Sequence, residues 1–392
     1  MTEAIEQIVI AKSPLDETHS RLGGNMFARD GWSVPANYGD TLLEYASVRE
    51  GGVGVMDLSP RGRMLVSGTE AIQFLNGLIT NDMKTLAENS WMPAAFPSVQ
   101  GRLIASVRVI RLSDEQADQT TPTGLPRREP RENVCPAFLI DTEPATSERV
   151  LKTIERFTLA GDFRVRDVTA QTALLTVQGK KSTGGVRSVF GEAAAGLAAR
   201  GVLKIAWQEG EVTILRATHT GEDGFDLIVN ADLASTLWDA LHAAGARPVG
   251  YEALETLRIE AGLPRYGIDM DETNVVTETA LDDAVSYTKG CYVGQEIIAR
   301  IKYRGHVAKK LAGIKFMEGA KVEVGSAIKS MDDKEIGRVT STSYSPHLGR
   351  RIGLGYVKYD YLVAETPVKV AAELGDVEGR IAELPFVSRV AP

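Results

Sequence analysis

Apolar residues recur at two spacings along the chain, and each spacing predicts one kind of secondary structure. A period of three to four residues predicts helices over residues 38–48, 70–78, 147–157 and 251–261. Thr69 is the expected N-cap of the second helix, and Gly262 with Pro264 ends the last. Alternating or continuous apolar runs predict strands over residues 53–58, 64–68, 102–112, 138–140, 173–179, 212–218 and 225–229.

The order of these elements predicts an α+β region followed by a small β domain. The strands that end at Gly68 and Gly179 lead into similar polar turns, which suggests two similar α+β units in series. After Gly305, short strands separated by Gly, Asp and Pro predict a β-barrel or sandwich. We therefore expect one region over residues 1–304, with a mobile polar loop at about 113–136, and a β-barrel domain over residues 305–392.

The composition narrows the class of protein. Of 392 residues, 43% are hydrophobic and 24% charged, which is ordinary for a soluble globular protein. A net charge of -8 argues against a protein whose whole surface binds along nucleic acid. Cys135 and Cys291 are the only cysteines and lie far apart, so a disulfide framework is excluded and a reducing cytoplasm fits. The N-terminus lacks signal-peptide features and no apolar run approaches a membrane span of roughly 20 residues, so we expect a cytoplasmic protein without a membrane partner.

Common catalytic motifs are missing from the sequence. It has no Walker loop, no GxGxxG at a strand–helix junction and no HExxH, and its five histidines do not cluster, so no metal site is predicted. Cys135 receives no role. A basic run at residues 300–310 is either an RNA or polyglutamate contact or a solvated face, and the overall acidity makes RNA the weaker alternative.

Residues 289–296, of sequence KGCYVGQE, are the first candidate site. Gly290 and Gly294 permit unusual backbone angles, so the turn can present Cys291 outward. Lys289 and the N-terminus of the helix predicted to run from there to Gly305 favour a reactive thiolate. The alternative is that Cys291 packs as a small buried hydrophobe and the glycines only make a turn.

The hairpin turn at residues 218–226 is the second candidate. Phe225, Leu227 and Val229 share one face of a strand, so Asp226 projects from the other face. A carboxylate fixed there can accept two parallel hydrogen bonds from a guanidine-like edge, such as that of a reduced pterin. The alternative is a solvated acid in a turn.

The chain resembles the folate-binding family that contains the glycine-cleavage T-protein and YgfZ. The resemblance covers about residues 24–385. Its T-protein-like segments are residues 31–35, 81–83, 220–224, 257–262, 266–272 and 345–348, and its YgfZ-like segment is KGCYVGQE at residues 289–296. The resemblance implies a cloverleaf of intertwined α+β domains that holds tetrahydrofolate in a central channel, with a C-terminal β-barrel.

The resemblance also implies roles for particular residues. Asp226 falls where the family has an acid that holds the pterin, His219 where methyl-transferring members have Tyr, and Leu254 where T-proteins have Arg. Cys291 is implied to be a reactive or ligating thiol, poised by Lys289. The acidic pair of T-proteins, of which one Asp acts near the folate nitrogen, is replaced by Ile104 and Ala105, which argues against aminomethyl transfer.

Three functions follow from these observations. The leading one is a tetrahydrofolate-binding, YgfZ-like accessory protein that supports iron–sulfur cluster assembly or repair and so the cluster enzymes that modify tRNA. The alternative is a folate-dependent aminomethyl or methyl transferase. Whether the protein catalyses any reaction is left open by the sequence. The third is an RNA-binding module that rests on the basic run.

Overall fold

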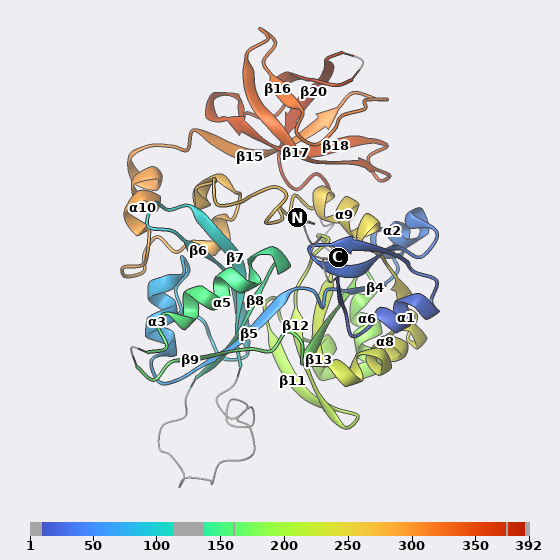
Figure 1. Ribbon diagram of the computed structural model, residues 1–392. Helices are drawn as coiled ribbons and strands as arrows, with labels where there is room; N and C mark the ends of the chain where they lie inside the picture. Colours follow the sequence, from blue (N-terminus) through green and yellow to red (C-terminus); the bar gives the residue numbers. More distant parts are fainter. Residues whose placement is uncertain (1–9, 113–135, 160, 374, 389–392) are drawn as a thin grey trace, which may run out of the picture.

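The computed structural model describes residues 10–112, 136–159, 161–373 and 375–388 (Figure 1). The expected mobile loop lies outside the described residues except for Pro136, as do Cys135 and the N-terminal residues considered for a signal peptide. Within the described ranges, no helix combines the length and apolar character needed to cross a bilayer.

The first half is built on a five-stranded sheet. Its strands lie in the order β6 (Ser90–Pro97), β7 (Leu103–Arg111), β8 (Ala137–Thr142), β5 (Gly62–Ser67) and β9 (Arg164–Asp167). The apolar faces of α3 (Ala71–Leu78) and α5 (Ser147–Glu155) cover the outer face of this sheet. They bury one alternating set of strand residues, among them Val107 and Val109 of β7.

A six-stranded sheet forms the second half. Its order is β11 (Val202–Trp207), β12 (Gly210–Arg216), β13 (Gly224–Asn230), β10 (Thr172–Gln178), β4 (Gly54–Asp57) and β14 (Arg247–Pro248). The helices packed on its outer face include α6 (Ser182–Phe190), α7 (Glu192–Ala195) and α8 (Ala234–Ala243). Because β4 precedes β5 in the chain but pairs with β10, the two halves are intertwined.

The inner faces of the two sheets pack against each other, giving helix, sheet, sheet and helix layers (Figure 1). Ile110 of β7 and Ile228 of β13 belong to this shared core, whereas Val109 and Leu227 lie in the two outer cores. The alternation of each strand therefore decides which residues face the space between the sheets.

A smaller layer closes one end of that space. It contains a three-stranded sheet of β1 (Ala11–Lys12), β3 (Trp32–Asn37) and β2 (Asn25–Arg29), together with α1 (Asp16–Arg21), α2 (Thr41–Arg49) and α9 (Tyr251–Glu260). Short 3-10 turns span Pro144–Thr146, Ala231–Leu233, Val276–Glu278, Asp282–Ala284 and Tyr359–Tyr361.

The last strands form a closed barrel, as the sequence predicts. The order is β15 (Lys309–Phe316), β18 (Arg350–Lys358), β17 (Glu335–Ser345), β16 (Ala327–Lys329), β19 (Pro367–Val370) and β20 (Val377–Ala382). A division between residues 304 and 305 remains our proposal for the domain boundary. The barrel sits above the other layers, next to α9, and α10 (Gln295–Arg304) precedes its first strand in the chain (Figure 1).

Helix α9 is bonded to alternate residues of β17. Arg258 donates to Ser341 over 2.6 Å, Thr256 and Ser343 share a hydrogen bond of 2.7 Å, and Ser345 donates to Glu260 over 2.5 Å. The same helix carries Tyr251 and Leu254, which pack against the core between the sheets. The barrel thus fixes the position of a helix that also borders the space between the sheets.

The predicted helices and strands are observed with boundaries shifted by a few residues. The first predicted helix begins at Thr41, because the Asp40 side chain accepts hydrogen bonds from the backbone N–H groups of Leu42 and Leu43. The prediction of Thr69 as a cap is wrong. Glu70 occupies the N-cap of α3, and Thr69 instead donates its backbone N–H and its hydroxyl to Asp162.

Candidate functional site

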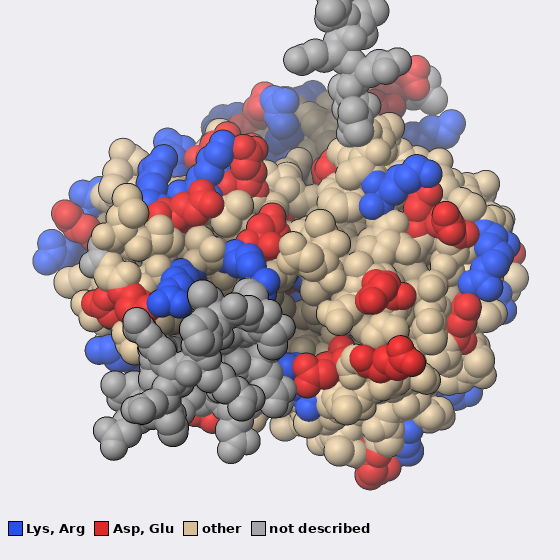
Figure 2. Space-filling model, turned by 60° about the horizontal axis from the view of Figure 1, so that its bottom comes forward, with Lys and Arg blue, Asp and Glu red and all other residues tan. Residues whose placement is uncertain are grey.

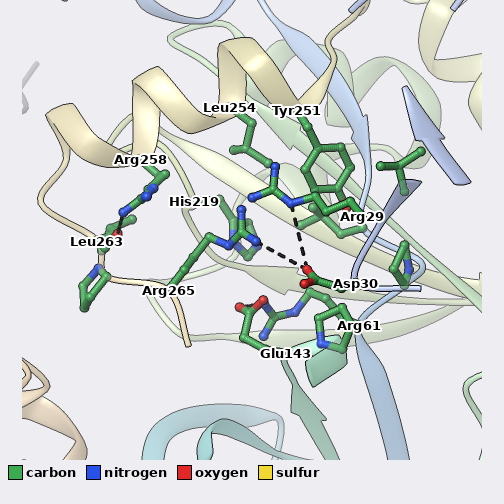
Figure 3. A pocket seen from close by; sticks show the side chains of 15 residues that line it. Arg29, Asp30, Arg61, Glu143, His219, Tyr251, Leu254, Arg258, Leu263 and Arg265 are labelled. Carbon is green, nitrogen blue, oxygen red and sulfur yellow. Dashed lines mark hydrogen bonds and ion pairs between the residues drawn. The ribbon is translucent and has the colours of Figure 1, made fainter. Parts of the chain in front are cut away.

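A cavity of about 110 Å³ opens where the inner faces of the sheets meet α9 and the β2–β3 turn (Figure 3). Tyr251 and Leu254 project into it from α9, and His219 reaches it from the hairpin before β13. Arg61 and Glu143 line the opposite side. The sequence-predicted residues His219 and Leu254 therefore share one cavity.

Asp226 lies beneath His219 and is fully buried. The His219 Nε2 atom is 3.1 Å from one carboxylate oxygen and 3.0 Å from the other. Because a carboxylate only accepts hydrogen bonds, Nε2 carries the proton in this pair. Asp226 faces away from Phe225 and Leu227, as predicted, but the alternative of a solvated turn acid is wrong because no water reaches the side chain.

The guanidinium of Arg108 is the second partner of Asp226. Its Nη1 donates to Asp226 Oδ2 over 2.5 Å, and its Nε donates to Asp141 Oδ2 over 2.7 Å. Burial alone raises the pKa of Asp226, but the charges of His219 and Arg108 outweigh burial and hold this pKa far below its usual range. The site therefore contains a permanent buried carboxylate. Sequence reasoning missed Arg108, although a charged residue at an inner-face position of a predicted strand was a usable signal.

A row of alternating charges continues from Asp226 to the cavity rim. Asp141 accepts from both Arg108 and Arg61, and Arg61 also bonds Glu143. Asp141 is fully buried, which raises its pKa, but the two guanidinium groups outweigh burial and lower it to about 2. The row joins β13, β7, β8 and the turn after β4 across the gap between the sheets.

A second set of ion pairs forms the outer wall of the cavity. Asp30 lies between Arg29 and Arg265 (Figure 3), and both arginines also pair with Glu255, over 3.2 Å and 3.1 Å. These four residues also border an open groove toward the barrel, whose apolar lining includes Phe27. The wall thus separates the inner cavity from the groove.

The family of the chain follows from its comparison with known proteins. Residues 15–128 and 136–289 match the family model of the GCVT N-terminal domain, and residues 309–388 match that of the Glycine cleavage T-protein C-terminal barrel domain. The chain belongs to the glycine-cleavage T-protein family.

Relatives in this family match along nearly the whole chain. Aminomethyltransferases from Thermotoga neapolitana and Rubrobacter xylanophilus are each 30% identical, over 96% and 98% of this chain and 97% and 96% of their own. The crystal structure of glycine cleavage system aminomethyltransferase T from Bartonella henselae has a TM-score of 0.84 at 21% identity, covering 97% of this chain and 99% of that one. The predicted cloverleaf with a C-terminal barrel is confirmed.

Strand β7 carries Ile104 and Ala105, the two residues expected to replace the acidic pair of T-proteins. Ala105 is fully buried in the outer core between the five-stranded sheet and its helices, and Ile104 packs against the same core. Ser106 and Arg108 alternate with Ala105 and so face the inner side. An acid at position 105 would therefore point away from the cavity, so the argument against aminomethyl transfer stays a prediction that depends on Ile104, the other position of the pair.

Leu254 forms an apolar part of the cavity wall in this protein. It is half-buried on α9 and packs with the shared core between the sheets and with the core beneath α2. A leucine has no hydrogen-bonding group, so the polar contacts on this side of the cavity come from neighbours such as Arg258.

Lys289 and Cys291 lie outside this cavity lining. The Lys289 ammonium donates to the backbone carbonyls of Asn76, Ile79 and Asn81, at 2.7, 3.0 and 2.6 Å. These three bonds use all of its N–H donors, so none is left for a thiolate at Cys291. Burial lowers the pKa of Lys289 to about 8. The predicted pairing of Lys289 with Cys291 is replaced by a contact with the C-terminal end of α3.

Cys291 itself is exposed, as its predicted presentation requires. Gly294 has φ of +77°, and a Cβ there would lie 2.3 Å from the Ser98 carbonyl oxygen, so this position requires glycine. Gly290 meets no such constraint, because a Cβ there has open space. The residues described contain no group of three or more His, Cys, Asp or Glu side chains placed to hold a metal ion.

The basic run has mixed surroundings. Lys310 pairs with Asp282 over 3.0 Å, and Lys302 lies 5.0 Å from the Tyr287 ring centroid. On another face of the molecule, the one turned forward in Figure 2, Lys and Arg side chains are mixed with Asp and Glu side chains. Neither observation adds support to the RNA prediction.

Proposed function

We propose that this protein binds tetrahydrofolate, or a one-carbon derivative of it, and acts as a folate-dependent one-carbon transferase. The observation that carries the proposal is the buried carboxylate of Asp226, which is held by the cavity-lining His219 in a member of the T-protein family. An ionised carboxylate binds the two adjacent N–H groups of a pterin by charge-assisted hydrogen bonds.

The other cavity residues fit a flat heterocycle. Tyr251 and Leu254 offer apolar surface on one side, while His219 orients the carboxylate and is a positioning residue in this proposal. The transferase part is tested separately. We expect methylenetetrahydrofolate to form when the protein and tetrahydrofolate are supplied with an aminomethyl donor. If no donor gives product, the transferase activity is excluded and only the proposal of folate binding stands.

Replacing Asp226 by Asn is expected to weaken the binding of 5-formyltetrahydrofolate by about 10- to 100-fold, because the charge-assisted bonds to the pterin lose their anion. Isothermal titration calorimetry measures this. The matched control is Asp57→Asn, since Asp57 is a buried acid held over 3.0 Å by His19, which, unlike His219, does not line the cavity. Equal affinity of wild type and Asp226→Asn would contradict the proposal, as would absence of binding to folded wild-type protein.

A second candidate function rests on Cys291. We propose that the exposed thiol acts in iron–sulfur cluster assembly or repair, with a partner protein supplying the remaining ligands. The supporting observation is that Cys291 is exposed in the same turn as Gly294, a glycine that the local backbone requires. In a strain lacking this protein, Cys291→Ala is expected to restore cluster-dependent tRNA thiolation less well than wild type. Full restoration, measured as thiolated nucleoside content, would exclude this role.

A further inference from the structure

Asp30 differs from the other charged residues that line the cavity. Each of the others forms a hydrogen bond with another side chain: Arg29 and Arg265 with Glu255, Arg61 with Glu143, His219 with Asp226, and Arg258 with Asp269. Asp30 Oδ2 lies 3.9 Å from Arg29 Nε and 3.5 Å from Arg265 Nη2 (Figure 3), and no described residue donates a hydrogen bond to it. Its carboxylate is therefore free to accept hydrogen bonds from a ligand.

The hairpin between β2 and β3 fixes the place of this carboxylate. Arg29 pairs with Trp32, so Asp30 and Gly31 form a two-residue turn, with φ of +50° and +80°. Turns with positive φ at both positions favour Asp, Asn and Gly. Asn or Gly can therefore replace Asp30 and leave the backbone of the turn as it is.

Asp30 borders both the cavity and the groove beside the barrel. The cavity has a volume of about 110 Å³ and the groove about 400 Å³. Sites for small molecules usually have volumes of about 300–1,000 Å³, so the cavity alone is too small for a ring with a long tail. A ligand whose ring occupies the cavity must extend its tail into the groove, and that tail passes Asp30.

The charges around Asp30 favour a hydrogen-bond donor at this point. Burial raises the pKa of Asp30, Arg29 lowers it, and the acids Glu143 and Glu255 raise it further, so the pKa stays above its ordinary value. The positive charges beside Asp30 thus do not offset the burial of its carboxylate. An N–H group of a ligand stabilises the ionised form, whereas a ligand anion at the same place is repelled.

We propose that Asp30 accepts a hydrogen bond from an N–H group in the linker between the ring and the tail of the ligand. The ligand class is a heterocycle joined to its tail through a secondary amine. In a folate this amine is N10–H, between the pterin and the benzoyl group. The inference rests on the proposed folate function and names the residue that distinguishes an N–H linker from an N-alkyl linker.

The test compares folic acid with 10-methylfolic acid, in which a methyl group replaces the N10 hydrogen. Calorimetry gives the ratio of the two dissociation constants for wild type and for Asp30→Gly, which keeps the turn and removes the acceptor. Any preference that other residues cause is common to both proteins. We expect the preference for folic acid to be about tenfold smaller in Asp30→Gly, the equivalent of one hydrogen bond to a charged group.

Two further variants complete the comparison. Asp30→Asn suits the same turn and keeps a neutral acceptor, so its preference should fall by only about threefold. Asp333→Gly is the matched control, since Asp333 also has positive φ, of +61°, but lies in the turn before β17, outside the cavity lining. Its ratio should equal that of wild type. Circular dichroism and urea unfolding confirm that each variant is folded.

The outcomes separate this inference from the function on which it rests. If the ratio in Asp30→Gly lies within about twofold of wild type, the contact of Asp30 with the linker is excluded, while folate binding stands. Wild-type protein that binds neither folic acid nor 5-formyltetrahydrofolate overturns both. If Asp30→Gly does not fold, Asp30→Asn takes its place, and an unchanged ratio in folded Asp30→Asn overturns the inference.

Discussion

Asp141→Asn is expected to lower the free energy of unfolding by about 3–5 kcal/mol, because it removes the shared anion of two buried cations. Asp141 is fully buried, and both Arg61 and Arg108 donate to it. An asparagine of the same size offers one acceptor oxygen and turns an amide toward a guanidinium. Urea unfolding followed by fluorescence measures the loss.

An exposed acid provides the control for this substitution. Asp283 pairs with Arg200 over 2.6 Å at the surface, where such pairs contribute about 0–1 kcal/mol, so Asp283→Asn should unfold nearly as wild type does. A loss below about 1 kcal/mol in Asp141→Asn would mean that Arg61 and Arg108 find other partners or water.

The lowered pKa of Asp141 also predicts how the free energy of unfolding depends on pH. The pKa of Asp141 is lowered to about 2 in the folded protein from the ordinary value of 3.8. A lowered pKa stabilises the fold above the unfolded-state value, and this contribution disappears as the pH falls from about 4 to 2. It corresponds to about 2 kcal/mol. The difference in stability between wild type and Asp141→Asn should therefore shrink over that pH range.

Lys289→Met is expected to cost about 2–4 kcal/mol of unfolding free energy. Its ammonium bonds three backbone carbonyls at the end of α3, and methionine leaves these buried acceptors without a donor. Lys180, exposed after β10, gives the matched control Lys180→Met, which should change stability by less than about 0.5 kcal/mol. If Lys289→Met were as stable as wild type yet inactive, the lysine would instead belong to the chemistry.

Local patterns in the sequence predicted most of the fold. The helix that ends before Gly262, the hairpin before Asp226 and the barrel strands each depend on residues close together in the chain, so spacing alone reveals them. The inward face of Asp226 follows from alternation within one strand. The partner of Asp226 does not, because Arg108 lies 118 residues away and meets it only when two sheets pack.

In the KGCYVGQE stretch, closeness in the sequence led to a wrong prediction of a contact. Lys289 and Cys291 are near neighbours in sequence, which suggested that the cation acts on the thiol. The lysine side chain instead reaches carbonyls more than 200 residues earlier in the chain, from Asn76 to Asn81. Adjacency along the backbone says little about where a long side chain ends, and only the packed position of α3 reveals it.

The bonds between α9 and β17 give the barrel a thermodynamic connection to the cavity. Tyr251 and Leu254 border the cavity on the same helix that binds Ser341, Ser343 and Ser345 of the barrel. If a ligand in the cavity shifts α9, the barrel surface must respond, and linkage makes that effect reciprocal. Suppose that a molecule bound to the barrel changes the affinity of the cavity for its ligand by some factor. A filled cavity must then change the affinity of the barrel for that molecule by the same factor. The barrel can therefore report the occupancy of a site to which it contributes no catalytic group.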